Sequence, residues 1–376
     1  MMKKNVIVIL IDGGRVDFVK KSPNFIKLQK NSIFFPNSIT YAPYTNASMH
    51  AFISGSYGNR NGTYSYWHSS NFKGNEFKTL TDYLKESDFS TCFDGHSDLI
   101  LPKKNFDQYF VHNENEVDLV KKHGDLLREM KHVNDENKNF FLYLHYSQIH
   151  TGLKNEVLIP FDNFSKEYFD DTEKNKQRYL KLFENASSYL ENMMSLIQSL
   201  EFDKNSIVLV LSDHGVSIGE KIGERGYGAF CYDYTIKTFA YLQIPGIKSD
   251  TIINQIRHID FLPTILDLLD IKIDDSFSEI DGKSLVPLIN KQNYTENIAF
   301  SETGNPLHEK SPPKIPNVKS IRTSEWKLIL NEYDDTKELY NILKDPFEKN
   351  NLIGKKPDIE SKLWTEFLKI ERKSLV

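Results

Sequence analysis

Short continuous apolar runs alternate along the chain with longer stretches in which apolar residues recur every three to four positions. The apolar runs cover residues 6–11, 140–145, 207–211 and 238–244, with weaker ones at 32–38 and 89–93. Buried parallel strands have this pattern because both of their faces pack against helices. The helical periodicity covers residues 46–53, 79–85, 116–130 and 165–200, and a further stretch after Asp260. The alternation predicts an α/β fold with a mostly parallel sheet sandwiched by helices.

The pattern changes after about residue 290. A Pro-rich loop is followed by short strand-like pieces at residues 318–322, 327–330 and 338–340, and by an amphipathic helix at 359–370. We therefore expect a catalytic α/β domain over residues 1–290 and a C-terminal subdomain over residues 291–376. The subdomain is predicted to be a small antiparallel sheet with a terminal helix.

Composition excludes several other classes of protein. The 376 residues carry 47 basic and 52 acidic side chains, a formal charge of −5, which does not favour nucleic acid as a partner. Cys92 and Cys231 are the two cysteines, too few for a disulfide scaffold or a multi-cysteine zinc site. No apolar run approaches the roughly 20 residues of a membrane span, and the run at 6–11 stops at Asp12, unlike a signal peptide. These features predict a cytoplasmic protein.

Polar residues with ligand chemistry follow two of the predicted strands. Asp12 ends the first strand, and Ser212-Asp213-His214-Gly215 follows residues 207–211. Ligands bind at the carboxyl ends of strands in open α/β sheets, where two facing carboxylates would repel each other unless a cation lies between them. His214 would add a nitrogen ligand to such a site. The alternative is that Asp12 and Asp213 only cap the helices that follow them.

A third segment offers a hydroxyl at the start of a helix. Pro43 keeps Ala42 out of the helical region, so Thr45 is predicted to be the N-cap of a helix that ends near Gly55. A hydroxyl there lies near free backbone N–H groups, which favour a bound anion. Thr45 is accordingly either a nucleophile or a plain N-cap residue.

Taken in order, these segments resemble the sulfatase family of the alkaline phosphatase superfamily. Relatives carry a Leu-Thr-Gly whose glycine lies ten residues after the nucleophile, and Gly55 stands at that distance from Thr45. The run from Gly55 to Gly62 is similar to the family's Gly-Arg-Tyr-Pro-x-Arg-x-Gly. Further matching segments are Ile259-Asp260-Phe261-Leu262-Pro263-Thr264-Ile265, Asp281-Gly282-Lys283-Ser284-Leu285, Glu338-Leu339-Tyr340-Asn341 and Asp345-Pro346-Phe347-Glu348.

The chain also departs from the family pattern. Thr45 cannot be converted to formylglycine, because its β-carbon carries a methyl group. Met49 replaces the arginine expected four positions after the nucleophile, and Gly13 replaces a second aspartate. Gln148 stands where many relatives have aspartate, and Tyr227 stands in a Gly-Tyr-Gly where several have Gly-His-Gly. The remaining set is similar to the threonine-nucleophile branch, which includes phosphoglycerol and phosphoethanolamine transferases.

That resemblance implies one divalent metal ion (manganese, magnesium, calcium or zinc). Its expected ligands are Asp12, Thr45, Asp213 and His214. A two-metal arrangement is the alternative. His145 and His150 lie in the right region for it, but the partner aspartate is missing, and His145 is expected to be a core or supporting residue.

Four residues are expected to assist the reaction, and for Arg60, His150 and Lys221 a plain surface position is the alternative. Arg60 is the candidate supporting cation, and His150 the candidate proton donor to the leaving group, since an imidazole has a pKa near 6.5. Asn46 and Lys221 are candidate substrate-binding residues. The aromatic segment 64–68 is either a sugar-facing wall or core packing.

The sequence thus predicts a metal-dependent hydrolase of phosphate or sulfate esters with Thr45 as nucleophile, and phosphoesters are favoured. The expected substrate is a small-molecule or carbohydrate ester. A phosphotransferase acting on a sugar or glycan, and an inactive binding protein on the same fold, are the alternatives. The oligomeric state is not predicted.

Overall fold

The computed structural model describes residues 4–159, 166–224, 226–306 and 313–374. Its main feature is a nine-stranded sheet. The strands in chain order are β1 (Asn5–Ile11), β2 (Ile33–Ile39), β3 (Ser90–Gly95), β4 (Gln108–Val111), β5 (Phe140–Tyr146), β6 (Ser206–Leu211), β7 (Lys237–Gln243), β8 (Asp250–Thr251) and β9 (Ile256–Arg257). Their spatial order is β4-β3-β5-β1-β6-β7-β2-β8, and β9 also pairs with β2.

Strand β1 lies at the centre of the sheet. It pairs in parallel with β5 on one side and β6 on the other, so that Val8 is aligned with both Tyr143 and Leu209. Within the described residues, β7 is the strand that runs antiparallel to its neighbours β6 and β2. The predicted mostly parallel sheet is therefore confirmed, and the carboxyl ends of β1, β5 and β6 meet at one edge.

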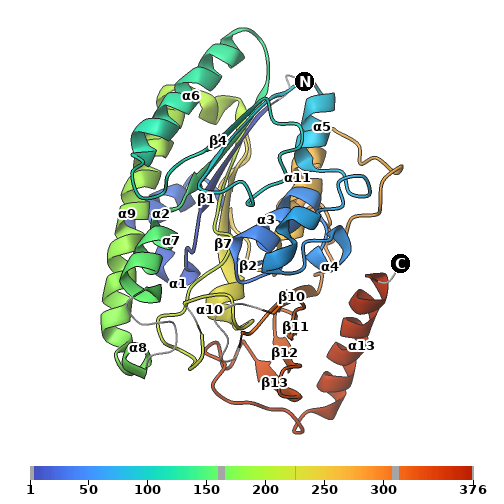
Figure 1. Ribbon diagram of the computed structural model, residues 1–376. Coiled ribbons are helices and arrows are strands. Elements are labelled where there is room, and N and C mark those ends of the chain that lie inside the picture. The colour runs from blue at the N-terminus through green and yellow to red at the C-terminus, as the bar shows by residue number, and fades with distance from the viewer. Residues whose placement is uncertain (1–3, 160–165, 225, 307–312, 375–376) are drawn as a thin grey trace.

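Helices cover both faces of this sheet (Figure 1). One face carries α1 (Val16–Val19), α2 (Pro23–Gln29), α6 (Leu119–Asp135), α7 (Gln148–Leu153), α8 (Lys166–Asp170) and α9 (Thr172–Ser199). The other carries α3 (Thr45–Ser54), α4 (Gly58–Asn61), α5 (Leu80–Glu86) and α11 (Phe261–Leu268). Helix α12 (Val286–Ile289) contacts α11. Short 3₁₀ helices cover Tyr66–Asn71, Phe202–Lys204 and His258–Asp260, and a π-helical turn covers Lys154–Leu158.

Successive side chains of β1 point to opposite faces of the sheet, and both faces are buried, which explains why its sequence is continuously apolar. Ile7, Ile9 and Ile11 pack into the core under α6 and α9. The intervening residues, Val6 and Val8 among them, pack into the core under α3, α5 and α11. A strand buried on both faces has no solvent-facing position, so no polar residue alternates along it.

The C-terminal region forms a four-stranded antiparallel sheet. Its strands are β10 (Ala299–Thr303), β11 (Val318–Arg322), β12 (Trp326–Asn331) and β13 (Thr336–Asn341), in that order. Helix α13 (Pro357–Lys373) lies along this sheet (Figure 1) and buries Leu363 and Phe367 in a core shared with Phe300. A separate apolar cluster is formed where Cys231 and residues of α10 (Asp233–Ile236) pack against the same strands.

Several predicted boundaries need correction. The predicted helix at 165–200 is two helices, because the Asp171 side chain caps a new helix by accepting from Lys174 N–H; residue 165 lies outside the described residues. Strands β4, β8, β9 and β10 were not predicted, since they are short or only partly apolar. Over the part of the chain that the structure describes, no helix combines the length and apolar character needed to cross a membrane.

Candidate active site

Asp12, Asp213 and His214 come together at the carboxyl ends of two neighbouring strands. Because β1 and β6 are parallel, the residues that follow Ile11 and Leu211 emerge side by side. His214 Nε2 lies 3.6 Å from Asp12 Oδ1 and 3.5 Å from Asp213 Oδ2, and all three side chains are buried. Burial, and next the Asp12 carboxylate, raise the pKa of Asp213 above its ordinary value.

One oxygen of each carboxylate has no hydrogen-bond partner among the described residues. These are Asp12 Oδ1 and Asp213 Oδ2. The other Asp213 oxygen accepts from Gly13 N–H at 3.1 Å and from His214 N–H at 2.9 Å, so the backbone fixes the orientation of the carboxylate. A buried, unpaired carboxylate oxygen is costly unless a cation compensates it. The donor set therefore fits a divalent metal ion.

The Thr45 hydroxyl completes this group. Its Oγ1 lies 3.5 Å from Asp12 Oδ2 and 3.4 Å from His214 Nε2. The predicted N-cap role is wrong by one position: Tyr44, with φ −157°, is the N-cap, and Thr45 is the first residue of α3. The extended backbone at Tyr44 leaves the threonine hydroxyl free to face Asp12 instead of capping its own helix. We call Asp12, Thr45, Asp213 and His214 the strand-end cluster.

A hydrogen bond connects α3 to the carboxyl end of β6. The Ser48 hydroxyl donates to the Asp213 carbonyl at 2.9 Å. It also lies close to Thr40, with Oγ atoms 2.5 Å apart. The third turn of α3 ends at Gly55, whose φ of +65° suits a glycine C-cap, as predicted. The helix start is thus held against β6 from within the core.

Three histidines lie on the other side of Asp12. His145 Nε2 lies 3.0 Å from Asp12 Oδ2, and His150 Nδ1 lies 3.8 Å from the same oxygen. The ring of His96 lies 4.8 Å from that of His145 and 5.0 Å from that of His150. Burial lowers the pKa of His145 and of His96 to about 3, so both rings are neutral at ordinary pH. Neutral imidazoles are suited to bind metal ions.

His150 stands at the border between this buried group and solvent. Its side chain is 21% exposed, and its Nδ1 lies 3.0 Å from the Tyr227 hydroxyl. The Tyr227 ring in turn packs 4.7 Å from the His214 ring. The position gives His150 access to both the strand-end cluster and solvent, as a proton donor requires.

The other predicted site residues have partners outside the strand-end cluster. Arg60 pairs with Asp281 at 2.9 Å. Lys221 Nζ donates to the Glu348 carbonyl at 2.9 Å, and Asn46 donates to the Ser69 hydroxyl at 3.0 Å. These contacts tie each side chain to a neighbouring segment, and the direct roles assigned to them from sequence stay predictions.

Three residues near the site were not singled out as functional by the sequence: His96, Glu114 and Tyr227. His96 follows β3 directly, and β3 is a neighbour of β5, so a polar residue after the predicted strand 89–93 was an available signal. Glu114 lies 4.0 Å from His150 Nε2 in a loop that carries no motif. Tyr227 was noted only as a departure from the family pattern.

A second buried histidine group lies deeper in the fold. Asp94 Oδ2 contacts His112 Nδ1 at 3.0 Å and His123 Nε2 at 2.8 Å. The outer ring nitrogens contact the Ser147 and Tyr189 hydroxyls. These hydrogen bonds connect β3, α6, α9 and the β5–α7 junction, and so support the segments that carry His96 and His150.

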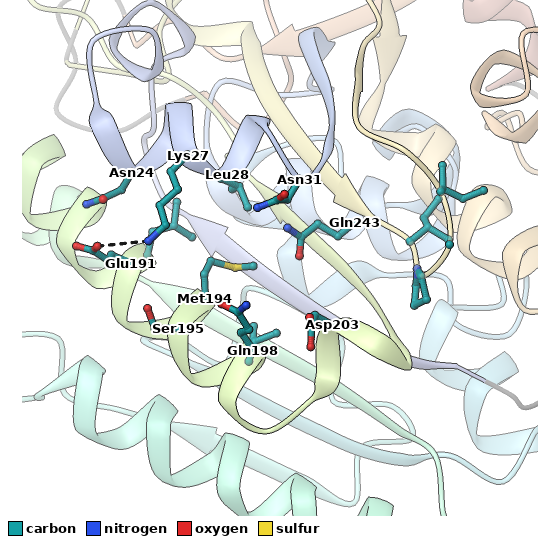
Figure 2. Close-up of a pocket in the computed structure, with 16 residues that line it drawn as sticks. Asn24, Lys27, Leu28, Asn31, Glu191, Met194, Ser195, Gln198, Asp203 and Gln243 are labelled. Carbon is teal, nitrogen blue, oxygen red and sulfur yellow. Dashed lines mark ion pairs between the residues drawn. The ribbon is translucent and has the colours of Figure 1, made fainter.

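A cavity of about 350 Å³ lies at the opposite end of the sheet (Figure 2). It is bordered by α2, α9 and the end of β7, and an ion pair between Lys27 and Glu191 at 3.8 Å joins the two helices. Gln243, at the end of the antiparallel strand β7, marks this as the amino edge of the parallel strands. None of the predicted site residues lies there.

The fold and the strand-end cluster define an alkaline-phosphatase-like α/β protein with a carboxylate–histidine site. The family model named Sulfatase matches residues 4–271, so this chain belongs to the sulfatase family. A second model, N-sulphoglucosamine sulphohydrolase, C-terminal, matches residues 223–373, which include the small antiparallel sheet and α13.

Curated relatives are sulfatases of low identity. A choline-sulfatase of Rhizobium meliloti is 28% identical over 190 residues, covering 49% of this chain and 35% of that protein. An N-acetylglucosamine-6-O-sulfatase of Bacteroides thetaiotaomicron is 31% identical over 160 residues, covering 40% of this chain and 27% of that protein. The matched region thus spans less than half the length of these relatives.

Solved structures share the fold along nearly the whole chain. One, in complex with its substrate D-glucosamine-2-N,6-O-disulfate, has a TM-score of 0.75 at 17% identity and covers 99% of this chain and 98% of its own. A phosphonate monoester hydrolase from Silicibacter pomeroyi has a TM-score of 0.72 at 15% identity, covering 99% and 95%.

Proposed function

We propose that this chain is a metal-dependent ester hydrolase in which Thr45 is the nucleophile. One observation carries the proposal: the Thr45 hydroxyl lies 3.4 Å from His214 Nε2 and 3.5 Å from Asp12 Oδ2. Two neighbouring carboxylate oxygens are buried without a hydrogen-bond partner among the described residues. A hydroxyl nucleophile beside unpaired carboxylate oxygens suits ester cleavage assisted by a cation.

Asp12, Asp213 and His214 would hold one divalent ion, with the Thr45 oxygen as a further ligand. Such an ion lowers the pKa of a coordinated hydroxyl and neutralises charge on the non-bridging oxygens of the ester. The N–H groups at the start of α3 would stabilise the same anionic oxygens.

The residues of this chain then divide the reaction into two steps. Thr45 Oγ1 gives its proton to solvent and forms a bond to the phosphorus or sulfur, while the bond to the leaving oxygen breaks. His150 gives a proton to that oxygen, which departs as an alcohol. Water then attacks the phosphorus or sulfur of the Thr45 ester and gives one proton to His150, while the bond to Thr45 Oγ1 breaks. The Thr45 oxygen takes a proton back from solvent, and the inorganic anion is released.

Phosphoesters are the proposed preference over sulfate esters. The β-methyl group of Thr45 rules out conversion to formylglycine, so the side chain must act as an alcohol. The matched relatives bear sulfatase names, whereas one structural neighbour is a phosphonate monoester hydrolase. Both anions present similar tetrahedral oxygens to the site, and assays with both kinds of ester separate them.

The two free cysteines are buried, which supports the proposal of a reducing, cytoplasmic setting.

A substrate panel tests the proposal. Phosphomonoester, phosphodiester and sulfate-ester substrates are each assayed with manganese, magnesium, calcium and zinc after removal of metal by a chelator. We expect activity that needs an added ion, is greatest on a phosphoester, and falls at least 10³-fold in Thr45→Ala, roughly the loss seen when a nucleophile is removed.

Two variants complete the test. Thr45→Ser keeps the hydroxyl and should retain measurable activity, and Thr336→Ala, at the exposed start of β13, should match the parent. Hydrolysis by Thr45→Ala at the parental rate would overturn the proposed nucleophile. A metal content near zero in active protein would overturn the metal site.

A further inference from the structure

His96 is a partly buried histidine whose Nδ1 has no hydrogen-bond partner among the described residues. It follows β3 directly, and β3 lies beside β5, which in turn lies beside β1. The carboxyl ends of these three strands therefore bring His96 together with His145 and Asp12. One ligand atom of each side chain lies within 4.8 Å of the other two.

The Asp12 carboxylate takes part in two groups, one through each oxygen. Its Oδ1 lies 3.6 Å from His214 Nε2 in the strand-end cluster, whereas its Oδ2 lies 3.0 Å from His145 Nε2. Asp12 and Asp213 are fully buried, and within the described residues their ion pairs are with histidines rather than with lysine or arginine. An ion in the strand-end cluster would bind Oδ1, so Oδ2 can bind a second cation.

The donor atoms of the second group differ from those of the strand-end cluster. Asp12, His96 and His145 offer two imidazole nitrogens and one carboxylate oxygen, whereas the strand-end cluster offers three oxygens and one nitrogen. Imidazole-rich sets suit zinc and similar transition-metal ions, and oxygen-rich sets suit magnesium, calcium or manganese. The second group is therefore suited to an ion of a different chemical class.

The spacing of the second group is close to what a zinc ion requires. Bonds of about 2.0–2.2 Å in a tetrahedron place the ligand atoms roughly 3.4 Å apart. His145 Nε2 and Asp12 Oδ2 are already 3.0 Å apart. The His96 and His145 rings lie 4.8 Å apart at an angle of 68°. Because His96 is only partly buried, a rotation of its side chain can bring a ring nitrogen within range.

The surroundings of His145 favour metal binding through Nε2. Its Nδ1 lies 3.3 Å from the buried Tyr143 hydroxyl. A proton on Nδ1 can be donated to that hydroxyl, which leaves the Nε2 lone pair for a cation that Asp12 Oδ2 also binds. Metal-binding histidines commonly donate their other ring N–H in this way, which fixes the tautomer and the orientation of the ring.

A neighbouring group, which we call the outer group, is less suited to an ion. It consists of His96, Glu114 and His150, again with ligand atoms within 4.8 Å of one another. Glu114 already forms an ion pair with Lys154 at 2.7 Å, and His150 Nδ1 lies 3.0 Å from the Tyr227 hydroxyl. The lysine would repel a cation bound there, so these contacts favour the group around Asp12.

We propose that Asp12, His96 and His145 bind a second divalent ion, zinc or a similar transition-metal ion, which shares Asp12 with the ion of the strand-end cluster. This site goes beyond the proposed function, because its ligands do not include Thr45 and its occupation does not require ester cleavage. His150 is not one of its ligands and can still serve as the proton donor.

Zinc content tests the second site without any turnover. Protein freed of metal with a chelator is dialysed against zinc, and the bound zinc is measured by inductively coupled plasma mass spectrometry. We expect two zinc ions per chain in the parent and in His132→Ala, whose histidine is exposed, but one in His96→Ala. Asp213→Asn, which disables the strand-end cluster, should also hold one, and Asp213→Asn combined with His96→Ala should hold none.

Two further measurements on Asp213→Asn identify the ligands of its remaining ion. Zinc should raise the melting temperature, because an ion that binds only the folded state stabilises it, and the rise should disappear when His96→Ala is added. The zinc X-ray absorption spectrum of Asp213→Asn should show two imidazole ligands. An ion still held by the strand-end cluster would show one imidazole, that of His214, and this result would overturn the assignment.

The outcomes separate this inference from the proposed function. One zinc ion in the parent, retained in His96→Ala, would overturn the second site and leave the proposed hydrolase intact. Two ions, one of them dependent on His96, in a protein that hydrolyses no ester would support the second site and overturn the hydrolase. Loss of an ion in His150→Gln as complete as in His96→Ala would place the ion in the outer group, and so would also overturn the inference.

Discussion

Asp213 illustrates at the scale of single residues how function and stability oppose each other. Its Oδ2 faces Asp12 in a buried setting and has no hydrogen-bond partner among the described residues, while its Oδ1 accepts two backbone N–H groups. In Asp213→Asn the amide oxygen can keep both backbone hydrogen bonds, and the amide nitrogen can donate toward Asp12. We expect the metal-free protein to be stabilised by roughly 1 kcal/mol, while activity is lost.

Thermal unfolding in the presence of a chelator measures this effect. Asp98→Asn, at an exposed position, serves as the control and should leave the melting temperature unchanged. A variant that melts below the parent without metal would contradict the idea that the two carboxylates repel each other in the unliganded fold.

His150 gives a second prediction at this scale, because a proton donor matters only when the leaving group needs a proton. We expect His150→Gln to reduce kcat on alkyl esters by roughly 10²–10³-fold. Nitrophenyl esters, whose leaving group is already stable as an anion, should lose much less. Rates across a series of leaving-group pKa values measure the difference, with the exposed His132→Gln as control. An equal loss on every ester would argue for a positioning role instead.

At the scale of elements, a buried ion group joins α10 to the C-terminal sheet. Asp233 contacts Arg322 of β11 at 2.8 Å and Lys327 of β12 at 3.1 Å, and all three side chains are at least nine-tenths buried. Although burial alone would raise the pKa of Asp233, the two cations hold it well below its ordinary value. Asp233→Ala would leave two buried cations with one fewer anion. We expect it to cost about 3–5 kcal/mol of unfolding free energy.

Urea unfolding checks this value. Asp250→Ala is the comparison, since Asp250 pairs with Lys291 at 3.1 Å on the surface, with side chains 41% and 79% exposed. An exposed pair is worth less than about 1 kcal/mol. If the two variants unfold at the same urea concentration, the buried ion group does not stabilise the contact between α10 and the C-terminal sheet.

At the scale of the whole molecule, Glu302 should make stability depend on pH. Burial raises the pKa of Glu302 from 4.5 to about 7, and the Tyr41 hydroxyl donates to this carboxyl where β10 meets the segment before α3. The fold therefore holds a proton that the unfolded chain releases. Stability is complete below about pH 4.5 and decreases as the pH rises through about 7, by roughly 3 kcal/mol in total for this group.

Unfolding free energies measured between pH 5 and pH 8 test this dependence. Glu302→Gln keeps a neutral group of the same shape, so its stability should vary less with pH than that of the parent. The exposed Glu325→Gln serves as control. An unchanged slope in Glu302→Gln would assign the pH dependence to other groups.

The pattern along the chain was sufficient for the fold class and for the location of three residues of the strand-end cluster. Continuous apolar runs such as residues 6–11 identify strands buried on both faces, and a polar residue directly after such a strand must lie at its carboxyl end. That reasoning placed Asp12, Asp213 and His214 at one sheet edge, as the register of β1 and β6 confirms. The resemblance to the family's nucleophile segment, through its spacing from Gly55, placed Thr45 at the nucleophile position, and the Thr45 hydroxyl faces the same group.

Contacts between distant segments were beyond the reach of the sequence. His96 and Glu114 approach His150 only because β3 lies beside β5 in the sheet, an order that local periodicity does not contain. The ion pair between Arg60 and Asp281 could not be predicted for the same reason, because the two residues lie far apart in the sequence. Local patterns report how each element buries its own surface, whereas the neighbours of a polar side chain depend on strand order and loop paths. Strand order and loop paths are determined by the free energy of the whole packed molecule, so only the tertiary structure shows them.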